Sequence, residues 1–172
     1  MLRSIRTDRV PNLLVLQYSA DWLVRNLLLV PRFFLSESVI EKRKPLNAQA
    51  RRAGWIGCNI LLGQVPVDGR IDMVSDGIPI PTRQVRTEFA RIRGLADIPP
   101  VVRGWALDTL NAVRRLNKPR FTLDEVYKFE DELKALHPAN RHVRPKIRQQ
   151  LQVLRDLGLL EFIRAGEYRM KN

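Results

Sequence analysis

The chain has 172 residues, and 30 Lys and Arg outnumber 18 Asp and Glu, giving a formal net charge of +12. Apolar residues make up 45%, which excludes a disordered tail, and the length suits one domain or two small ones. The basic excess predicts a polyanionic partner, with nucleic acid the first candidate, while Cys58, the single cysteine, excludes intrachain disulfides and zinc sites built on several thiolates.

Two apolar runs open the chain. Residues 12–18 and 26–30 are short and hydrophobic on both faces, which is typical of interior strands in a sheet covered on both sides. Asp21, Arg25 and Arg32 interrupt this region, so we expect no membrane span and a cytoplasmic protein. Trp22, within the same region, is interpreted as a core residue.

A short helix is expected at residues 36–42, followed by a loop. Residues 51–59 then mix basic, glycine and aromatic residues and fit neither the helical nor the strand period. Arg51 and Arg52 can reach phosphates or can be a solvated pair. Trp55 can stack on a base, wedge into a base step or pack against a methyl group, or it can anchor the loop in the core, and the spacing does not decide between these roles.

A strand is expected at residues 69–74 and a helix at 85–93, after which Pro99 and Pro100 suggest a linker at residues 97–103. We therefore predict one unit at residues 1–98 and a second at 99–172.

The second unit has a regular helical pattern. Residues 105–116 predict a helix with Trp105 in the core, and Thr122 with Glu125 forms a capping box that starts a helix reaching about residue 136. A third helix runs from about Pro145 to residue 157, and two strands at 159–163 and 168–171 follow it. Three helices and then a hairpin is the order of a winged helix-turn-helix.

The third helix has one polar face and one apolar face. Arg144, Arg148, Gln152 and Arg155 lie at i, i+4, i+8 and i+11, and no acidic residue occurs from 141 to 155. Arginine pairs with guanine edges and glutamine with adenine edges, although an ordinary solvated basic face has the same pattern. The candidate DNA-binding residues are Arg51, Arg52, Trp55, Arg141, Arg144, Lys146, Arg148, Gln149, Gln152 and Arg155.

Three separate stretches, residues 51–60, 121–130 and 146–156, resemble DpnI-type restriction endonucleases, the Dam-replacing family. The resemblance implies an α+β fold, in which part of a PD-(D/E)XK nuclease sheet precedes a winged helix. It also implies double-stranded DNA as the partner, cut at GATC when the adenine is N6-methylated. Mg²⁺ and a structural zinc are the cofactors of such enzymes.

The chain departs from that family at its start. The family has further sequence before the position matching Arg9, and this sequence carries the catalytic Asp, a Glu-x-Lys strand and cysteine pairs. The single Glu-x-Lys here, Glu132 to Lys134, falls inside the predicted second helix. With both metal-ligand sets absent and no catalytic residue assigned, we expect a truncated protein that binds methylated DNA without cutting it alone, and a separate nuclease segment is a possible partner. The alternatives are a non-catalytic winged-helix regulator and a basic RNA-associated protein.

Overall fold

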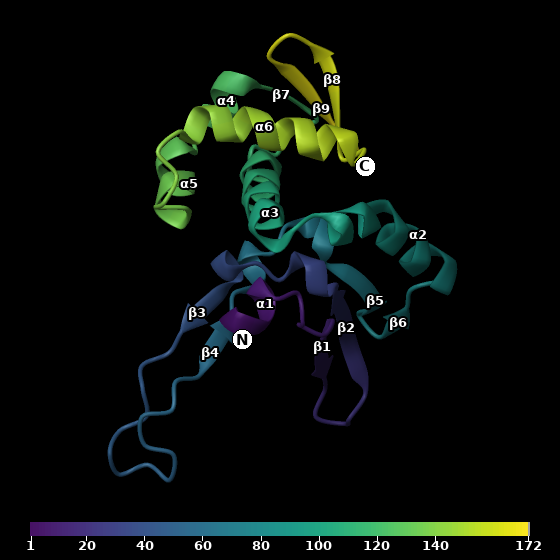
Figure 1. The fold of residues 1–172 in the computed structure, drawn as a ribbon. Coiled ribbons are helices and arrows are strands. Elements are labelled where there is room, and N and C mark those ends of the chain that lie inside the picture. The colour runs from purple at the N-terminus through teal and green to yellow at the C-terminus, as the bar shows by residue number, and fades with distance from the viewer. Residues whose placement is uncertain (172) are drawn as a thin grey trace.

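The computed structural model describes residues 1–171 and is α+β, as predicted (Figure 1). The helices are α1 (Leu2–Arg6), α2 (Thr82–Ile92), α3 (Pro100–Arg115), α4 (Leu123–Tyr127), α5 (Glu130–Leu136) and α6 (Val143–Asp156). The strands are β1 (Leu13–Tyr18), β2 (Val24–Val30), β3 (Ile40–Lys42), β4 (Cys58–Ile60), β5 (Ile71–Ser75), β6 (Ile78–Pro79), β7 (Arg120–Thr122), β8 (Leu160–Arg164) and β9 (Glu167–Met170). Among the described residues, no helix combines the length and the apolar character that crossing a bilayer requires.

The N-terminal sheet is antiparallel, in the order β1-β2-β5-β6. Val30 and Ile71 are buried at the end nearest the core, but Leu14 and Leu16 of the edge strand β1 are more than half exposed. The expectation of interior strands covered on both sides is therefore wrong for β1. Trp22 is not a core residue either, because it is 79% exposed at the β1–β2 turn. An apolar run shows that burial is favourable but does not show which elements supply the cover.

The predicted helix at residues 36–42 is also wrong. A 3₁₀ turn at Glu37–Val39 leads directly into β3, which pairs with β4 in a separate two-stranded sheet. Ile40 is β-branched and favours extended backbone, and its pairing with Ile60 of β4 outweighs the weak helical pattern of this short segment.

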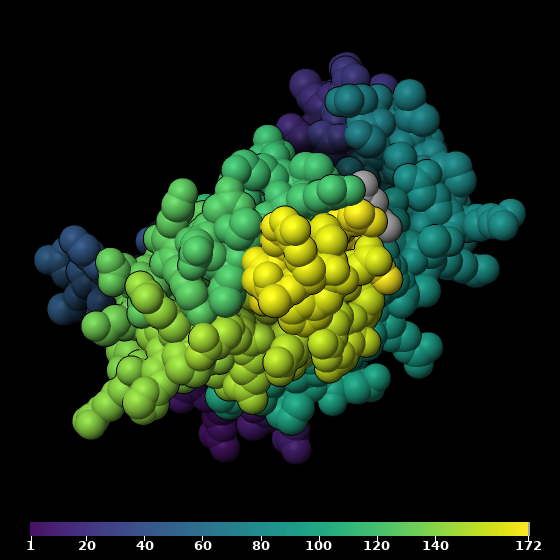
Figure 2. Space-filling view, turned by 90° about the horizontal axis from the view of Figure 1, so that it is seen from above, coloured from purple at the N-terminus to yellow at the C-terminus, as the bar shows by residue number. Residues whose placement is uncertain are grey.

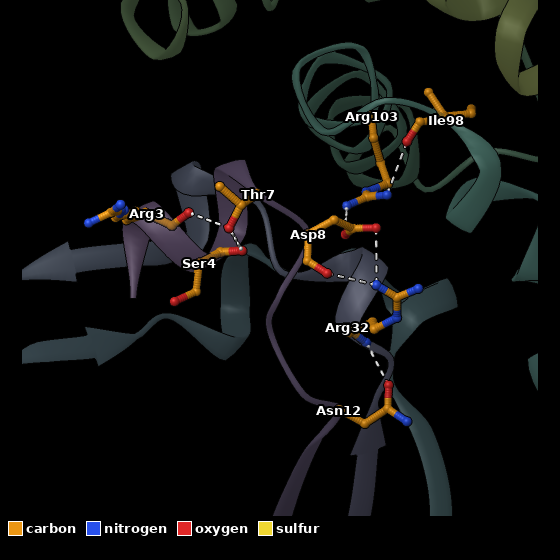
Figure 3. Close-up of polar contacts among 8 residues, drawn as sticks. All are labelled: Arg3, Ser4, Thr7, Asp8, Asn12, Arg32, Ile98 and Arg103. Carbon is orange, nitrogen blue, oxygen red and sulfur yellow. Dashed lines mark hydrogen bonds and ion pairs between the residues drawn. The ribbon is translucent and has the colours of Figure 1, made fainter.

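The segment at residues 97–103, expected to be a linker, leads from the end of a 3₁₀ turn at Arg93–Asp97 directly into α3, which begins at Pro100. Pro100 occupies the first turn of α3, where backbone N–H groups have no acceptor within the helix, so the absence of an N–H in proline costs no hydrogen bond. Arg103 is buried, donates to the Ile98 carbonyl at 3.0 Å and pairs with Asp8, which Arg32 also contacts at 3.0 Å (Figure 3). These contacts tie α3 to the N-terminal segment. Where one unit ends and the next begins stays a prediction.

The ion pairs of Asp8 with Arg103 and Arg32 predict that part of the folding stability is lost in acid. Burial raises the pKa of Asp8, but the hydrogen bonds and charges of Arg103 and Arg32 outweigh it, so the pKa lies below its ordinary value. The Asp8 carboxylate therefore takes up a proton more readily in the unfolded chain than in the folded one. Its stabilising contribution is complete above about pH 4 and is lost as the pH falls through the pKa of Asp8 in the folded state. We expect Asp8→Asn to lower the melting temperature at neutral pH and to flatten its fall in acid. The melting temperature is measured as a function of pH for the parent, for Asp8→Asn and for Asp21→Asn, which alters an exposed turn. If it falls by the same amount in acid for all three proteins, the prediction is contradicted.

Helix α3 stands between the N-terminal sheets and α6 (Figure 1). On one side Ser38 donates to Asp108 at 2.6 Å, and the other carboxylate oxygen of Asp108 bonds His137 at 2.8 Å. The His137 ring stacks on Trp105, which is buried as predicted, with 3.8 Å between ring centroids. Polar contacts from α3 therefore join residues that lie far apart in sequence.

In the C-terminal region, α4 and α6 pack against a sheet in the order β7-β9-β8, and α3 and α5 pack against α6. The predicted capping box at Thr122 and Glu125 is present, with both reciprocal hydrogen bonds formed. The predicted second helix is broken at Phe129, however, into α4 and α5. No glycine or proline marks that break, so the sequence pattern does not reveal it. Gly158 ends the third helix at a positive φ of 75°, as its position predicted.

Candidate nucleic-acid interface

Helix α6 has a buried apolar face and an exposed polar face beside it. Val143, Ile147, Leu151 and Leu154 are buried against α3 and the neighbouring helices. The adjoining face exposes the set expected from the sequence, which is Arg144, Arg148, Gln152 and Arg155. Below, these four residues are called the α6 face.

The two outer arginines of the α6 face are held in place. Arg144 donates to Glu130 at 2.6 Å, and its guanidinium lies 5.0 Å from the centre of the Tyr127 ring. The hydrogen bond to Glu130 raises the pKa of Arg144 above its ordinary value. Arg155 is similarly placed 4.9 Å from the centre of the Phe162 ring. Stacking on an aromatic face orients each guanidinium, and a carboxylate occupies part of its edge, Glu130 for Arg144 and Asp156 for Arg155, so only the remaining N–H groups are open to a partner.

The two inner residues of the α6 face have no such partners. Arg148 and Gln152 are exposed, and neither side chain forms a hydrogen bond or ion pair with any residue between 1 and 171. Their donors are therefore available to a ligand that lies along the helix.

The remaining predicted residues of this region lie outside that face. Arg141 is exposed just before the helix. Lys146 is half-buried and donates to Gln149 at 2.8 Å, and it helps to line a cavity of about 630 Å³ beside Trp105 and His137. Lys146 therefore points toward α3 and α5, while Arg144 and Arg148 point outward. The helical spacing of 100° per residue accounts for this separation.

Residues 43–57, the basic arm, join β3 to β4 and extend away from the rest of the chain (Figure 1). Backbone hydrogen bonds from Arg43 to Gly57 and from Leu46 to Trp55, both 3.0 Å long, close the base of the arm. Seen from above, its tip emerges on the side where α5 and the start of α6 lie (Figure 2). Figure 1 shows that the arm runs away from the β3–β4 sheet at the end of the molecule opposite to α6, so the tip of the arm and the α6 face are separated along the vertical axis of that view.

Trp55 lies on the basic arm with 54% of its surface exposed, so it does not anchor a core. A Cβ added to Gly57 would come within 3.0 Å of the Trp55 ring, which shows that the ring lies across this glycine. Arg51 and Arg52 are both exposed near the tip. An exposed indole beside guanidinium groups is suited to stacking on a base or contacting a methyl group.

Two basic residues of the arm were not among the predicted site residues. Arg43 and Lys44 are exposed, and the aliphatic part of Arg43 comes close to Gly57, beside the Trp55 ring. The signal was present in the sequence, because residues 42–57 contain no acidic residue. The sequence pattern did not indicate that β3 and β4 pair as a hairpin and bring the two ends of this segment together.

The residues present fit neither of the metals that the family resemblance implies. Cys58 is exposed on β4, and His137 is already bonded to Asp108. Glu132, the acid of the Glu-x-Lys sequence, lies on α5 and pairs with Arg115. Residues 1–171 contain no group of three His, Cys, Asp or Glu side chains placed to share an ion.

Two family models match the chain. The DpnI model, described as the Dam-replacing family, matches residues 1–98. The DpnI_C model, described as the Dam-replacing HTH domain, matches residues 102–170, which include all of α6 and the hairpin after it.

Proposed function

Because the chain belongs to the Dam-replacing family and carries its helix-turn-helix DNA-binding domain, we propose that it recognises duplex DNA at GATC sites with N6-methylated adenine. The observation that carries the proposal is the α6 face, with Arg148 and Gln152 exposed and unengaged between two oriented arginines. Arg148 suits the O6 and N7 of guanine, and Gln152 suits the N6 and N7 of adenine. Both bases occur in GATC.

The outer residues of the α6 face have a different role in this proposal. Arg144 and Arg155 are anchored on aromatic rings, and they contact phosphates on either side of the bases that are read. Phosphate contacts fix the register of the helix in the groove but carry no sequence information. The hairpin β8–β9 follows α6 in the position of the wing of a winged helix.

The basic arm contributes the second contact, in which Trp55 packs against the methylated adenine while Arg51 and Arg52 hold the backbone. Stacking of a base on an aromatic side chain is worth about 1–3 kcal/mol. We therefore expect Trp55→Ala to weaken binding to the methylated duplex by roughly 5- to 150-fold, and to change binding to the unmethylated duplex less.

Trp22→Ala is the matched control, because Trp22 is also exposed but lies on the β1–β2 turn. Fluorescence anisotropy with labelled duplexes measures both variants. Equal losses for Trp55→Ala on the two duplexes would show that the indole does not respond to the methyl group.

We also infer that this chain binds DNA without cutting it. The carboxylates of a PD-(D/E)XK site hold a divalent ion that activates water. Here Glu132 lies on a helix and is paired with Arg115, so it has neither the strand nor the partner acid that this chemistry needs. Incubation of methylated plasmid with the chain and Mg²⁺ should leave the plasmid intact, and specific cutting at GATC would overturn this inference.

A panel of duplexes tests the recognition itself. Dissociation constants are measured for fully methylated, hemimethylated and unmethylated GATC and for a scrambled sequence, each across a salt titration. We expect the fully methylated duplex to bind most tightly at every salt concentration. Equal affinity for all four would leave a protein that contacts phosphates only, since the phosphate term is independent of sequence. Preference for an unmethylated sequence would support the regulator alternative.

A further inference from the structure

Helix α2 carries a basic surface that none of the contacts above uses. Arg83 and Arg86 on α2, and Arg93, which caps its C-terminal end in helical backbone conformation, are exposed and lie at i, i+3 and i+10, which places them within about 80° around the helix axis. We call these three residues the α2 stripe. Phe89, on the side that packs inward, meets the ring of Phe33 at 5.7 Å.

The α2 stripe has no counter-charge. No hydrogen bond or ion pair in the described part of the chain engages its three guanidinium groups, whereas Arg144, Arg155 and Arg164 each pair with a nearby carboxylate. The one acid of α2, Glu88, is half-buried, accepts from Gln84 at 3.0 Å and lies on the other side of the helix. The stripe is therefore a row of like charges facing solvent.

Such a row costs the helix stability in the free protein. Arg83 and Arg86 are three residues apart, and like charges at that spacing destabilise a helix. A polyanion that lies along the helix would remove this repulsion.

We propose that the α2 stripe binds the phosphate backbone of duplex DNA, an inference that rests on the proposed function. Arg83 and Arg93 are ten residues apart, which is about 15 Å along the helix, or the axial length of about four base pairs. Such contacts would strengthen binding without selecting a sequence. In both overall views α2 lies on the side away from the basic arm, so changes in it leave the proposed reading residues intact (Figures 1 and 2).

The test is the triple variant Arg83→Gln, Arg86→Gln, Arg93→Gln, in which glutamine keeps the helix propensity and removes the charge. Its binding to methylated and unmethylated duplexes is measured across a salt titration. Three lost phosphate contacts should reduce the slope of log Kobs against log salt by about 2.7. Both duplexes should lose affinity by the same factor, so the preference for methylated DNA should not change.

The matched control is Arg3→Gln, Arg9→Gln, Arg25→Gln, which removes three exposed arginines elsewhere and gives the same net charge. An unchanged salt slope in the α2 variant, or an equal reduction in the control, overturns the proposal while the function of α6 stands. Loss of binding to the methylated duplex alone overturns it as well, because the stripe would then read the site. If the parent chain binds no duplex at all, the proposed function fails and this inference fails with it.

Discussion

Replacing Arg148 and Gln152 with alanine together is expected to weaken binding to methylated GATC by at least about 30-fold. Each good pairing between such a side chain and a base edge contributes about 1–3 kcal/mol of discrimination. Neither side chain is engaged by the rest of the described chain, so its removal should cost little folding stability. Binding to a scrambled duplex should fall much less. Dissociation constants for the two duplexes, measured at one fixed salt concentration, check this.

Arg3→Ala is the charge control, because Arg3 is exposed on α1 and its side chain forms no hydrogen bond or ion pair within residues 1–171. The single variants then show whether each residue contributes. If the double variant loses the same factor on both duplexes, Arg148 and Gln152 contact phosphates only, and α6 does not read the sequence.

Asp68→Ala is expected to destabilise the fold by about 3 kcal/mol. The Asp68 side chain is fully buried and pairs with Arg114 through two hydrogen bonds and with Arg91 at 3.3 Å. Removing one partner of a buried ion pair leaves the other charge without compensation, which typically costs about 3–5 kcal/mol. The lower figure applies here because Arg114 and Arg91 keep some access to water. Urea denaturation of the parent and variant gives the difference in the free energy of unfolding.

Asp21→Ala serves as the control for the loss of one acid, since Asp21 is exposed in a turn. A double-mutant cycle with Arg114→Ala should give a coupling energy of about 1 kcal/mol or more between the two sites. Additive effects, or a change in Asp68→Ala no larger than in the control, would show that the pair does not hold α3 against the N-terminal residues.

The C-terminal half was predictable because its signals are local. The capping box at Thr122, the glycine at 158 and the 3.6-residue repeat in α6 each act within a few residues. The same repeat correctly separated the α6 face from its buried side. It did not exclude Lys146, whose position depends on how α6 meets α3 and α5.

The N-terminal half was less predictable because its structure depends on distant partners. The sequence places Arg103 in a predicted linker, because its partner Asp8 lies 95 residues away and no local pattern indicates the pair. The exposure of β1 is likewise not visible in an apolar run, because the pattern does not show what lies beside an edge strand. In the candidate site, the aromatic partners of Arg144 and Arg155 come from other elements of the fold, so the sequence alone did not indicate them.

Hydrogen–deuterium exchange of the full chain, with and without methylated GATC duplex, tests most directly whether α6 and the basic arm bind one DNA site together. We predict that the methylated duplex slows exchange both in residues 43–57 and in residues 143–155. The unmethylated duplex should protect residues 43–57 less, because Trp55 then lacks the methyl group. Protection that appears in neither segment, or that is the same in both segments for the two duplexes, would contradict recognition of the methylated site by these residues.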